Sequence, residues 1–250
     1  MFKLAKPLLL AALLAASCAA RADELIVSAA ASLTNAFREI ATNYEAQYPG
    51  AKVGLNFGAS GALLQQAAKG APVDVFASAD QESMDQAEKL GLVKTGERRN
   101  FIGNSLVVVV PLKSTLSLAR LPDLAQPAIT RIAVGAPASV PAGRYARHAL
   151  DAASLWATVE PRVISTQNVR QALDYVSRGE VDAGFVYASD AALAKDTVRL
   201  AFPVALNEPI TYPIAAIATS TRGVEAKRFI AYVLSPAGQA VLFKFGFTKA

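Results

Sequence analysis

The sequence predicts an α/β protein of two lobes, in which each lobe is a mostly parallel β-sheet flanked by helices. Short apolar segments alternate with amphipathic helical segments along the chain, which is the pattern of repeated strand–helix units. Each half of the chain has its own set of these units. Two further apolar segments, residues 105–110 and 212–218, break the alternation, and we interpret them as antiparallel strands that cross between the lobes. One continuous sheet with two mixed strands is the alternative.

The first 22 residues predict a cleavable signal peptide. Lys3 and Lys6 supply a positive start, residues 7–16 form an unbroken apolar run, and residues 20–22 give an A-x-A cleavage site. The apolar run is too short to anchor the chain in a bilayer. We therefore expect a protein exported to the periplasm.

Cys18 is the single cysteine of the chain, and it lies within this segment. A lipid attached to Cys18 is the alternative to simple cleavage, although Ala15 stands where a lipoprotein signal has a bulky aliphatic residue. Cleavage leaves a mature chain without cysteine, which suits the oxidising periplasm.

Composition argues against several classes of function. The 250 residues are 53% hydrophobic and 18% charged, which is enough to bury a large core. The formal charge of +5 includes three basic residues of the signal peptide. Without these three, the mature chain has 22 of the 25 basic residues and all 20 acidic ones. The resulting net charge of +2 gives no support to nucleic-acid binding. One His and one Cys argue against His-based catalysis and against a protein-ligated metal, so we expect no cofactor.

The first lobe is predicted to begin with three strand–helix units, whose helices end near Pro49, Gly70 and Gly91. Its strands are expected at residues 25–27, 52–57 and 73–77, and its helices at residues 33–48, 62–69 and 81–90. The second lobe repeats this arrangement with strands at residues 131–134, 162–164 and 183–187, and helices at residues 142–150, 169–178 and from residue 189. A last helix at residues 224–234 rebuilds the first lobe. The lobes then comprise residues 23–103 with 213–250, and residues 104–212.

The junctions between strands and helices are the predicted binding site. Ligands of open α/β sheets bind outside the carboxyl ends of the strands, where helix N-termini present unpaired N–H groups. Five junctions fall there, at residues 29–33, 58–62, 139–143, 167–170 and 186–189. Apart from Arg170, which we expect to point to solvent, none of them carries a charged residue or a His. Hydroxyls and N–H groups without fixed charge favour a small, fully ionised oxyanion.

Four residues at these junctions have side chains or amides suited to that role. Ser32 and Ser60 are expected at helix N-cap positions among small residues, so that the N–H groups beside them are open to a ligand. Ala142 follows a proline in the first turn of a helix, and Tyr187 ends a buried strand. Each feature taken alone is also typical of ordinary structure, because Ser is a common cap and Tyr a common core residue.

Six motifs of the chain resemble those of the periplasmic molybdate-binding proteins of bacterial ABC transporters. They read AAASLTNA (29–36), GAPVDVFASADQ (70–81), GNSLVVVV (103–110), VPAGRYA (140–146), VYASD (186–190) and KFGFT (244–248). The resemblance covers residues 24–249. It implies a type II periplasmic binding protein, without enzymatic activity, whose lobes close by a hinge motion on one tetrahedral oxyanion.

The resemblance also implies which residues hold the oxyanion and which partner receives it. The ligand-binding groups it assigns are hydroxyls and backbone amides of Ser32, Ser60, Ala142, Val169 and Tyr187. No direct bond between the protein and the metal is implied. The closed form is expected to deliver molybdate or tungstate to a membrane permease, and the mature protein is expected to be a monomer.

Two other functions remain open on the sequence alone. A binding protein for another tetrahedral oxyanion such as sulfate would use the same donors and would differ in cavity size, whereas phosphate carries a proton and needs an acceptor that the junctions lack. An exported serine hydrolase is the second alternative. Residues 58–62 nearly match the G-x-S-x-G motif but lack its last Gly, and His148 is expected in mid-helix with a surface or structural role.

Overall fold

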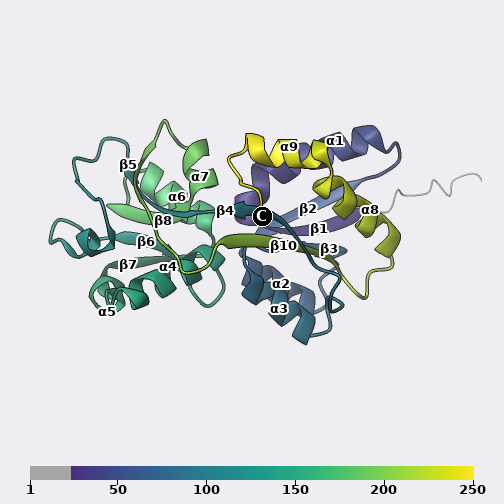
Figure 1. The fold of residues 1–250 in the computed structure, drawn as a ribbon, viewed down its shortest axis with the longest axis horizontal. Helices are drawn as coiled ribbons and strands as arrows, with labels where there is room; N and C mark the ends of the chain where they lie inside the picture. The colour runs from purple at the N-terminus through teal and green to yellow at the C-terminus, as the bar shows by residue number, and fades with distance from the viewer. Residues whose placement is uncertain (1–23) are drawn as a thin grey trace, which may run out of the picture.

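The computed structural model describes residues 24–250, and the predicted signal peptide with Cys18 lies outside the described residues. Two five-stranded sheets lie next to each other along the longest axis of the molecule, and each has helices on both faces (Figure 1). The fold is therefore two-lobed, as the sequence predicts.

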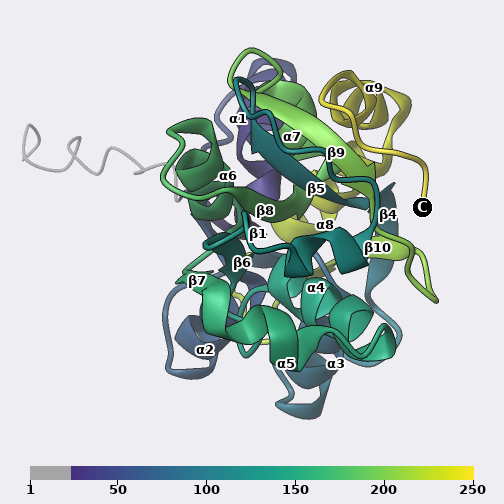
Figure 2. The same cartoon turned by 90° about the vertical axis from the view of Figure 1, so that its left-hand side faces the viewer.

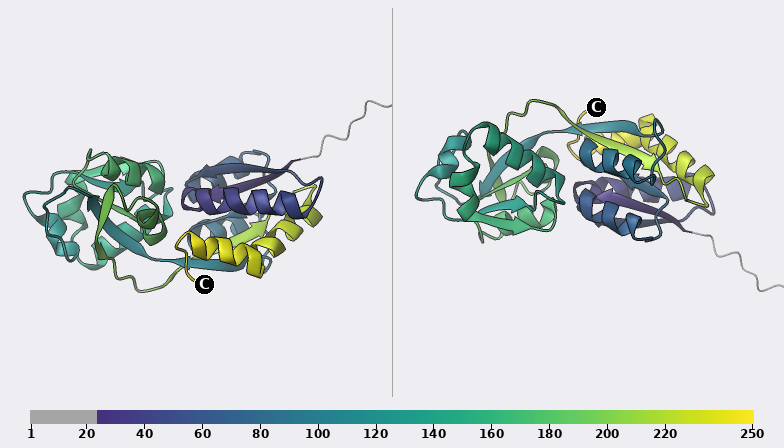
Figure 3. Two further views of the ribbon diagram at one scale, coloured as in Figure 1. Left: turned by 90° about the horizontal axis from the view of Figure 1, so that it is seen from above. Right: turned by 90° about the horizontal axis from the view of Figure 1, so that it is seen from below.

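The first sheet has the strand order β2-β1-β3-β10-β4. Its strands are β1 (Leu25–Ala30), β2 (Val53–Gly58), β3 (Val75–Ala77), β4 (Arg99–Asn104) and β10 (Ile210–Ala216). Its helices are α1 (Thr34–Gln47), α8 (Gly223–Leu234) and α9 (Pro236–Lys244) on one face, and α2 (Ser60–Ala68) and α3 (Gln81–Lys89) on the other (Figure 3).

The second sheet has the strand order β7-β6-β8-β5-β9. Its strands are β5 (Leu106–Pro111), β6 (Ile132–Gly135), β7 (Val163–Thr166), β8 (Ala183–Tyr187) and β9 (Val198–Pro203). Figure 2 views this lobe end-on, with α6 (Val169–Ser177) and α7 (Ala188–Leu193) above the sheet and α4 (Pro141–Ala152) and α5 (Trp156–Val159) below it. Short 3-10 turns lie at Ala31–Leu33, Leu121–Ala125 and Glu160–Arg162.

Each sheet contains one reversed strand, and its other four strands run in the same direction, which confirms the prediction of mostly parallel sheets. In the first sheet β1 pairs in parallel with β2 and β3, but β10 is antiparallel to both β3 and β4. In the second sheet β6 is parallel to β7 and β8, but β5 is antiparallel to β8 and β9. The reason is the route of the chain. A strand that enters a lobe from the cleft has to run away from the cleft, opposite to the strands whose carboxyl ends face it.

The chain crosses between the lobes twice. Sheet membership changes at Ser105, between β4 and β5, and again between Pro203 at the end of β9 and Ile210 at the start of β10. The two apolar segments interpreted as crossover strands, residues 105–110 and 212–218, correspond to β5 and β10, and each strand belongs to one sheet. The chain crosses between the lobes just before each of these strands begins. Paired crossings that run side by side are suited to act as a hinge between the lobes.

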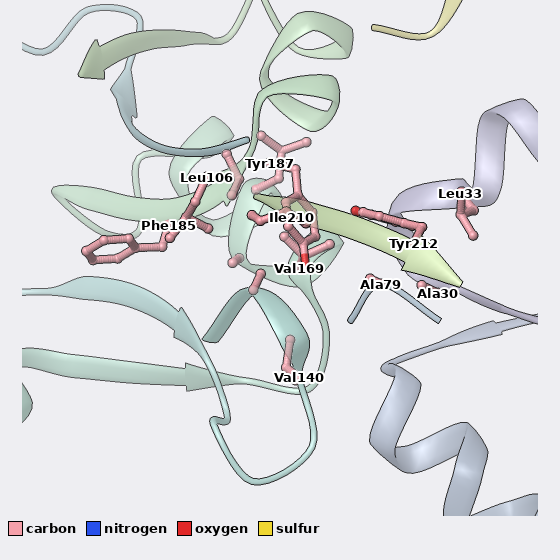
Figure 4. Packing of buried hydrophobic residues seen from close by; sticks show 14 of the residues in the cluster. Ala30, Leu33, Ala79, Leu106, Val140, Val169, Phe185, Tyr187, Ile210 and Tyr212 are labelled. Atoms are coloured by element: carbon pink, nitrogen blue, oxygen red, sulfur yellow. The ribbon is translucent and has the colours of Figure 1, made fainter. Parts of the chain in front are cut away.

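The hydrophobic core extends through both lobes and across the region between them. Val27, Phe37 and Ile40 lie in its first part and Val108, Val134 and Phe185 in its second, all fully buried. Figure 4 shows the middle of this core, where Tyr212 of β10 points its hydroxyl from the first lobe toward the second. No helix in residues 24–250 is both long enough and apolar enough to cross a membrane.

Candidate functional site

A small cavity lies between the lobes, at the carboxyl ends of strands from both sheets. The first lobe lines it with Ala30, Ala31, Ser32, Gly58, Ala59, Ser60 and Ala79, and the second lobe with Val140, Pro141, Ala142, Asn168, Val169 and Tyr187. The structure thus brings together all five residues that the sequence analysis placed at the site. None of the residues that line the cavity is charged.

The size of the cavity restricts its ligand to a few atoms. Its volume is about 10 Å³, which is close to the minimum of about 10–15 Å³ that holds one water molecule. Pockets for organic ligands commonly have about 300–1,000 Å³. Sugars and amino acids are therefore excluded from the cavity in this conformation of the lobes, and a compact inorganic ion is the size class that remains.

The two serines occupy different positions from those predicted. Ser32 lies inside the 3-10 turn Ala31–Leu33, and Ser60 is the first residue of α2, so neither is an N-cap. Their hydroxyls bond to other groups: the Ser32 Oγ lies 3.1 Å from the hydroxyl of Tyr212, and the Ser60 Oγ accepts a hydrogen bond of 3.0 Å from the N–H of Ala79. The prediction of capping was wrong because tertiary partners take the place of the helix N–H groups.

Helix α4 presents its first turn to the cavity from the second lobe. Its N-cap, Val140, makes no side-chain capping bond, so the first N–H groups of the helix have no side-chain acceptor there. Gly143 allows this turn to lie against the end of β6, because a Cβ at Gly143 would come within 1.8 Å of the carbonyl oxygen of Gly135. The amide of Ala142 is therefore held at the cavity by tight backbone packing.

Tyr187 ends β8 and is 1% exposed. Its hydroxyl has no hydrogen-bond partner among the described residues, and burial, with a smaller effect of the neighbouring Tyr212, raises the pKa of Tyr187 well above its usual value. The hydroxyl thus stays protonated and free to donate. A buried polar group without a partner destabilises the protein unless a ligand satisfies it.

Arg170 does not point to solvent, which corrects the prediction for this residue. It forms an ion pair with Asp190, at 2.6 Å between Nε and Oδ1, and its other guanidinium nitrogens donate to Asn35 Oδ1 at 2.9 Å and to the carbonyl of Ser32 at 3.1 Å. Asp190 is fully buried, and burial raises its pKa while Arg170 opposes that effect. Arg170 thus links the second lobe to the first without lining the cavity.

Three polar residues near the site were not found from the sequence. Arg144 of α4 bonds to Asp80 of the first lobe, and Asn104 lies where the chain first crosses between the lobes. All three belong to the motifs at 70–81, 103–110 and 140–146, but their partners are far away in the sequence, so spacing alone gave no signal for them. Elsewhere, no group of three or more His, Cys, Asp or Glu in residues 24–250 is placed to hold a metal ion.

A two-lobed α/β fold with a small uncharged cavity of hydrogen-bond donors between its lobes defines a solute-binding protein. The chain belongs to the bacterial extracellular solute-binding protein family, whose model matches residues 25–248. A solute-binding protein is not an enzyme, as expected. The serine-hydrolase alternative also lacks a base, because His148 lies outside the lining of the cavity, in a separate pocket beside Tyr145.

Relatives and solved structures agree with this family. The chain is 38% identical to the molybdate-binding protein of Escherichia coli over 92% of this chain and 91% of that protein. It is 36% identical to a putative ABC transporter substrate-binding lipoprotein of Bacillus subtilis, over 90% and 86% of the two chains. The periplasmic molybdate-binding protein of Azotobacter vinelandii superposes with a TM-score of 0.79 at 24% identity, over 90% of this chain and 99% of that one.

Proposed function

We propose that this protein captures molybdate, and also tungstate, in the cavity between its lobes and delivers it to the permease of an ABC transporter. The observation that carries the proposal is the chemistry of the cavity lining, which offers hydroxyls and backbone N–H groups and no charged side chain. Such a lining matches an anion that carries no proton of its own. The names of the relatives, which are molybdate-binding proteins, support the choice of anion.

The donors come from both lobes. Ser32 and Ser60 contribute hydroxyls from the first lobe, and Ala142, Val169 and Tyr187 contribute two amides and a hydroxyl from the second. Neither lobe alone surrounds the anion, so the anion binds the closed form better than any open form and shifts the population toward it. Hydrogen bonds to a charged group contribute about 1.5–3 kcal/mol each, and five of them are sufficient for sub-micromolar binding after the entropic cost of association.

The proposal includes the cellular setting. The signal peptide directs the chain to the periplasm, where the mature protein acts as a monomer and docks on the permease in its closed form. Lipid attachment at Cys18 is the alternative form of the same protein, and the similarity to a lipoprotein of Bacillus subtilis is in keeping with it.

Calorimetry of the mature protein with molybdate, tungstate, sulfate and hydrogen phosphate tests the proposal. Molybdate and tungstate are expected to bind with sub-micromolar dissociation constants, and sulfate at least about 100-fold more weakly because the smaller ion leaves the donors too far away. Replacing Ser32 or Ser60 by Ala is expected to weaken molybdate binding by at least about 1 kcal/mol each. Equal affinity for sulfate and molybdate would instead favour a general binder of tetrahedral oxyanions, and no change in either variant would disprove the site.

A further inference from the structure

A buried chain of polar groups leads from Ser32 to the first crossing between the lobes. The hydroxyl of Tyr212 lies 3.1 Å from the Ser32 Oγ and 3.2 Å from the Asn104 Nδ2, and the same Nδ2 donates to the Ser189 Oγ at 2.9 Å. All four residues are less than 10% exposed. Of the four, Ser32 alone lines the cavity. Tyr212, Asn104 and Ser189 therefore do not touch a ligand in the cavity, and the chain of hydrogen bonds reaches it through Ser32.

The side-chain amide of Asn104 has one orientation that satisfies its neighbours. Its Oδ1 accepts from the backbone N–H of Ser105 at 2.9 Å and lies 3.5 Å from the backbone N–H of Ser189. Backbone N–H groups are donors only, so the oxygen of the amide has to face them. The Nδ2 consequently faces Tyr212 as a donor.

The direction of the next two hydrogen bonds follows from that orientation. Because Nδ2 is a donor only, the Tyr212 oxygen accepts from Asn104 with one of its lone pairs, and the Ser32 Oγ is the acceptor that these contacts offer to the single Tyr212 proton. Burial raises the pKa of Tyr212 well above its usual value, so this proton is not lost to solvent in the neutral range. Ser32 accepts from Tyr212 and keeps its own proton for the cavity.

The Tyr212 ring is held in place by three aromatic neighbours. The ring centroids of Phe101, Tyr187 and Phe247 lie 6.4, 5.7 and 5.7 Å from that of Tyr212, all in edge-to-face geometry. Such packing fixes the ring and thereby the position of its hydroxyl. The bond to Ser32 is therefore oriented before any ligand enters the cavity.

Ser60 also accepts a hydrogen bond from a fixed donor, although that donor is a backbone group. Its Oγ accepts from the backbone N–H of Ala79, which is also a donor only. Each serine thus receives one hydrogen bond from a fixed donor behind it and has its own proton free in front. The bond from Asn104 occupies one of the acceptor sites of the Tyr212 oxygen and thereby favours the arrangement in which Tyr212 donates and Ser32 accepts.

We propose that Tyr212 and Asn104 are positioning residues, which set the Ser32 hydroxyl as a donor toward the bound oxyanion although neither touches the ligand. This inference rests on the proposed function, because it concerns the same cavity. It names two residues that determine affinity for a fully deprotonated anion. Their effect passes through one atom, the Ser32 Oγ.

A double-mutant cycle with molybdate as the probe tests this positioning role. Tyr212→Phe, Ser32→Ala and the double variant are titrated by calorimetry beside the wild-type protein. Tyr212→Phe is expected to weaken molybdate binding about tenfold in the wild-type background and less than about twofold in the Ser32→Ala background. Asn104→Ala is expected to repeat this pattern, which keeps the test valid if one of the two variants does not fold.

Tyr44→Phe is the matched control. Tyr44 is also a fully buried tyrosine of the first lobe, and its hydroxyl bonds to Glu225 and Arg228 away from the cavity. Its replacement should leave the affinity for molybdate unchanged. The positioning role is disproved if Tyr212→Phe has no effect, or if it has the same effect with and without the Ser32 hydroxyl. A wild-type protein that binds no oxyanion disproves the proposed function itself, and the first titration shows this before any variant is compared.

Discussion

Arg144 of the second lobe and Asp80 of the first form an ion pair, with 2.9 Å between the Arg144 Nη2 and the Asp80 Oδ2. Their side chains are only 12% and 4% exposed. Arg144 also donates to Ser83 Oγ at 3.1 Å, while Asp80 caps α3 by accepting from the N–H of Ser83. Because Arg144 comes from the other lobe, its contacts with Asp80 and Ser83 exist only when the lobes are together.

Arg144→Gln is therefore expected to weaken molybdate binding by about tenfold, or about 1.4 kcal/mol. The closed form loses its ion pair, whereas in an open form Asp80 is solvated with or without Arg144. Calorimetry measures the affinity, and stopped-flow release is expected to be faster by a similar factor.

Arg147→Gln is the control for that variant. Arg147 lies on the same helix and pairs with Asp151 four residues further on, and both side chains are at least 40% exposed. Its replacement should change the affinity less than twofold, since surface pairs of this kind contribute little. Equal losses in the two variants would mean that general charge, and not the contact between the lobes, is responsible.

The strand–helix units and the position of the cavity were predictable because they depend on local patterns. Apolar strands such as Ala183–Tyr187 are followed at once by helical segments, and the carboxyl ends of parallel strands meet at one edge. Five of the residues that line the cavity were predicted in this way, together with the resemblance. Two strands were missed: β4 begins with polar residues, Arg99 and Asn100, and β9 contains Arg199, so neither has the apolar pattern of a buried strand.

The polar groups around the cavity were not predictable, because their partners are distant in the sequence. Arg170 was expected in solvent, but it bonds to Asn35, which lies 135 residues away. Ser32 was expected to cap a helix, but Tyr212, 180 residues away, lies against its hydroxyl. The sequence pattern of a helix shows which of its residues are polar, but it does not show which residue of the other lobe forms a hydrogen bond with them. Those partners are known only from the structure in which the two lobes are in contact.

Gly61→Ala is expected to stabilise the ligand-free protein and to weaken ligand binding. Gly61 lies in the first turn of α2, where Ala is favoured by up to about 1 kcal/mol over Gly. In the closed form its N–H donates to the carbonyl of Ser139 in the other lobe at 3.0 Å, and an added Cβ would come within 2.8 Å of that oxygen and 2.9 Å of the Ser139 Cα. These atoms are backbone and cannot rotate away, so the lobes would close less completely.

Thermal melting and calorimetry separate the two effects. The melting temperature without ligand should rise by a degree or more, while the dissociation constant for molybdate increases at least about tenfold. Gly223→Ala is the matched control, because Gly223 begins α8 and a Cβ there meets nothing within 4 Å. It should raise the melting temperature without any change in affinity. If Gly61→Ala still binds molybdate tightly, the closed form tolerates a wider separation between Gly61 and Ser139.

Tyr187→Phe is expected to weaken molybdate binding about tenfold and to leave the ligand-free protein at least as stable as the wild type. The hydroxyl is buried without a partner among the described residues, so its removal costs no hydrogen bond in the free protein. With the anion bound, the same change removes a charge-assisted hydrogen bond of about 1.5–3 kcal/mol. Calorimetry and chemical denaturation measure the two quantities.

Tyr175→Phe serves as the control in the same lobe. The Tyr175 hydroxyl accepts from Gln171 Nε2 at 3.2 Å on helix α6 and does not line the cavity. Its removal should leave the affinity unchanged. If Tyr187→Phe binds molybdate as tightly as the wild type, its hydroxyl is not among the ligands of the anion.

Asp182→Asn is expected to lower the free energy of unfolding by about 1 kcal/mol at pH 7 and by much less at pH 3. The Asp182 carboxylate accepts from the N–H and the hydroxyl of Thr130, at 2.7 and 2.9 Å, and from the N–H of Arg131 at 2.9 Å. Partial burial raises the pKa of Asp182, but these hydrogen bonds outweigh burial and hold the pKa below its usual value. The expected loss of stability is small because the carboxylate is partly exposed to solvent.

The direction of the pH effect follows from the lowered pKa. A carboxylate whose pKa is lower in the folded state contributes its full stability above the pKa of the unfolded chain, about 3.9, and loses it as the pH falls through the folded value. Urea denaturation at pH 7 and pH 3 should therefore show a difference between variant and wild type that shrinks on acidification. Asp174→Asn, at an exposed position of α6, should show no difference at either pH. A gap of equal size at both pH values would mean that shape, and not the charge of Asp182, accounts for the loss.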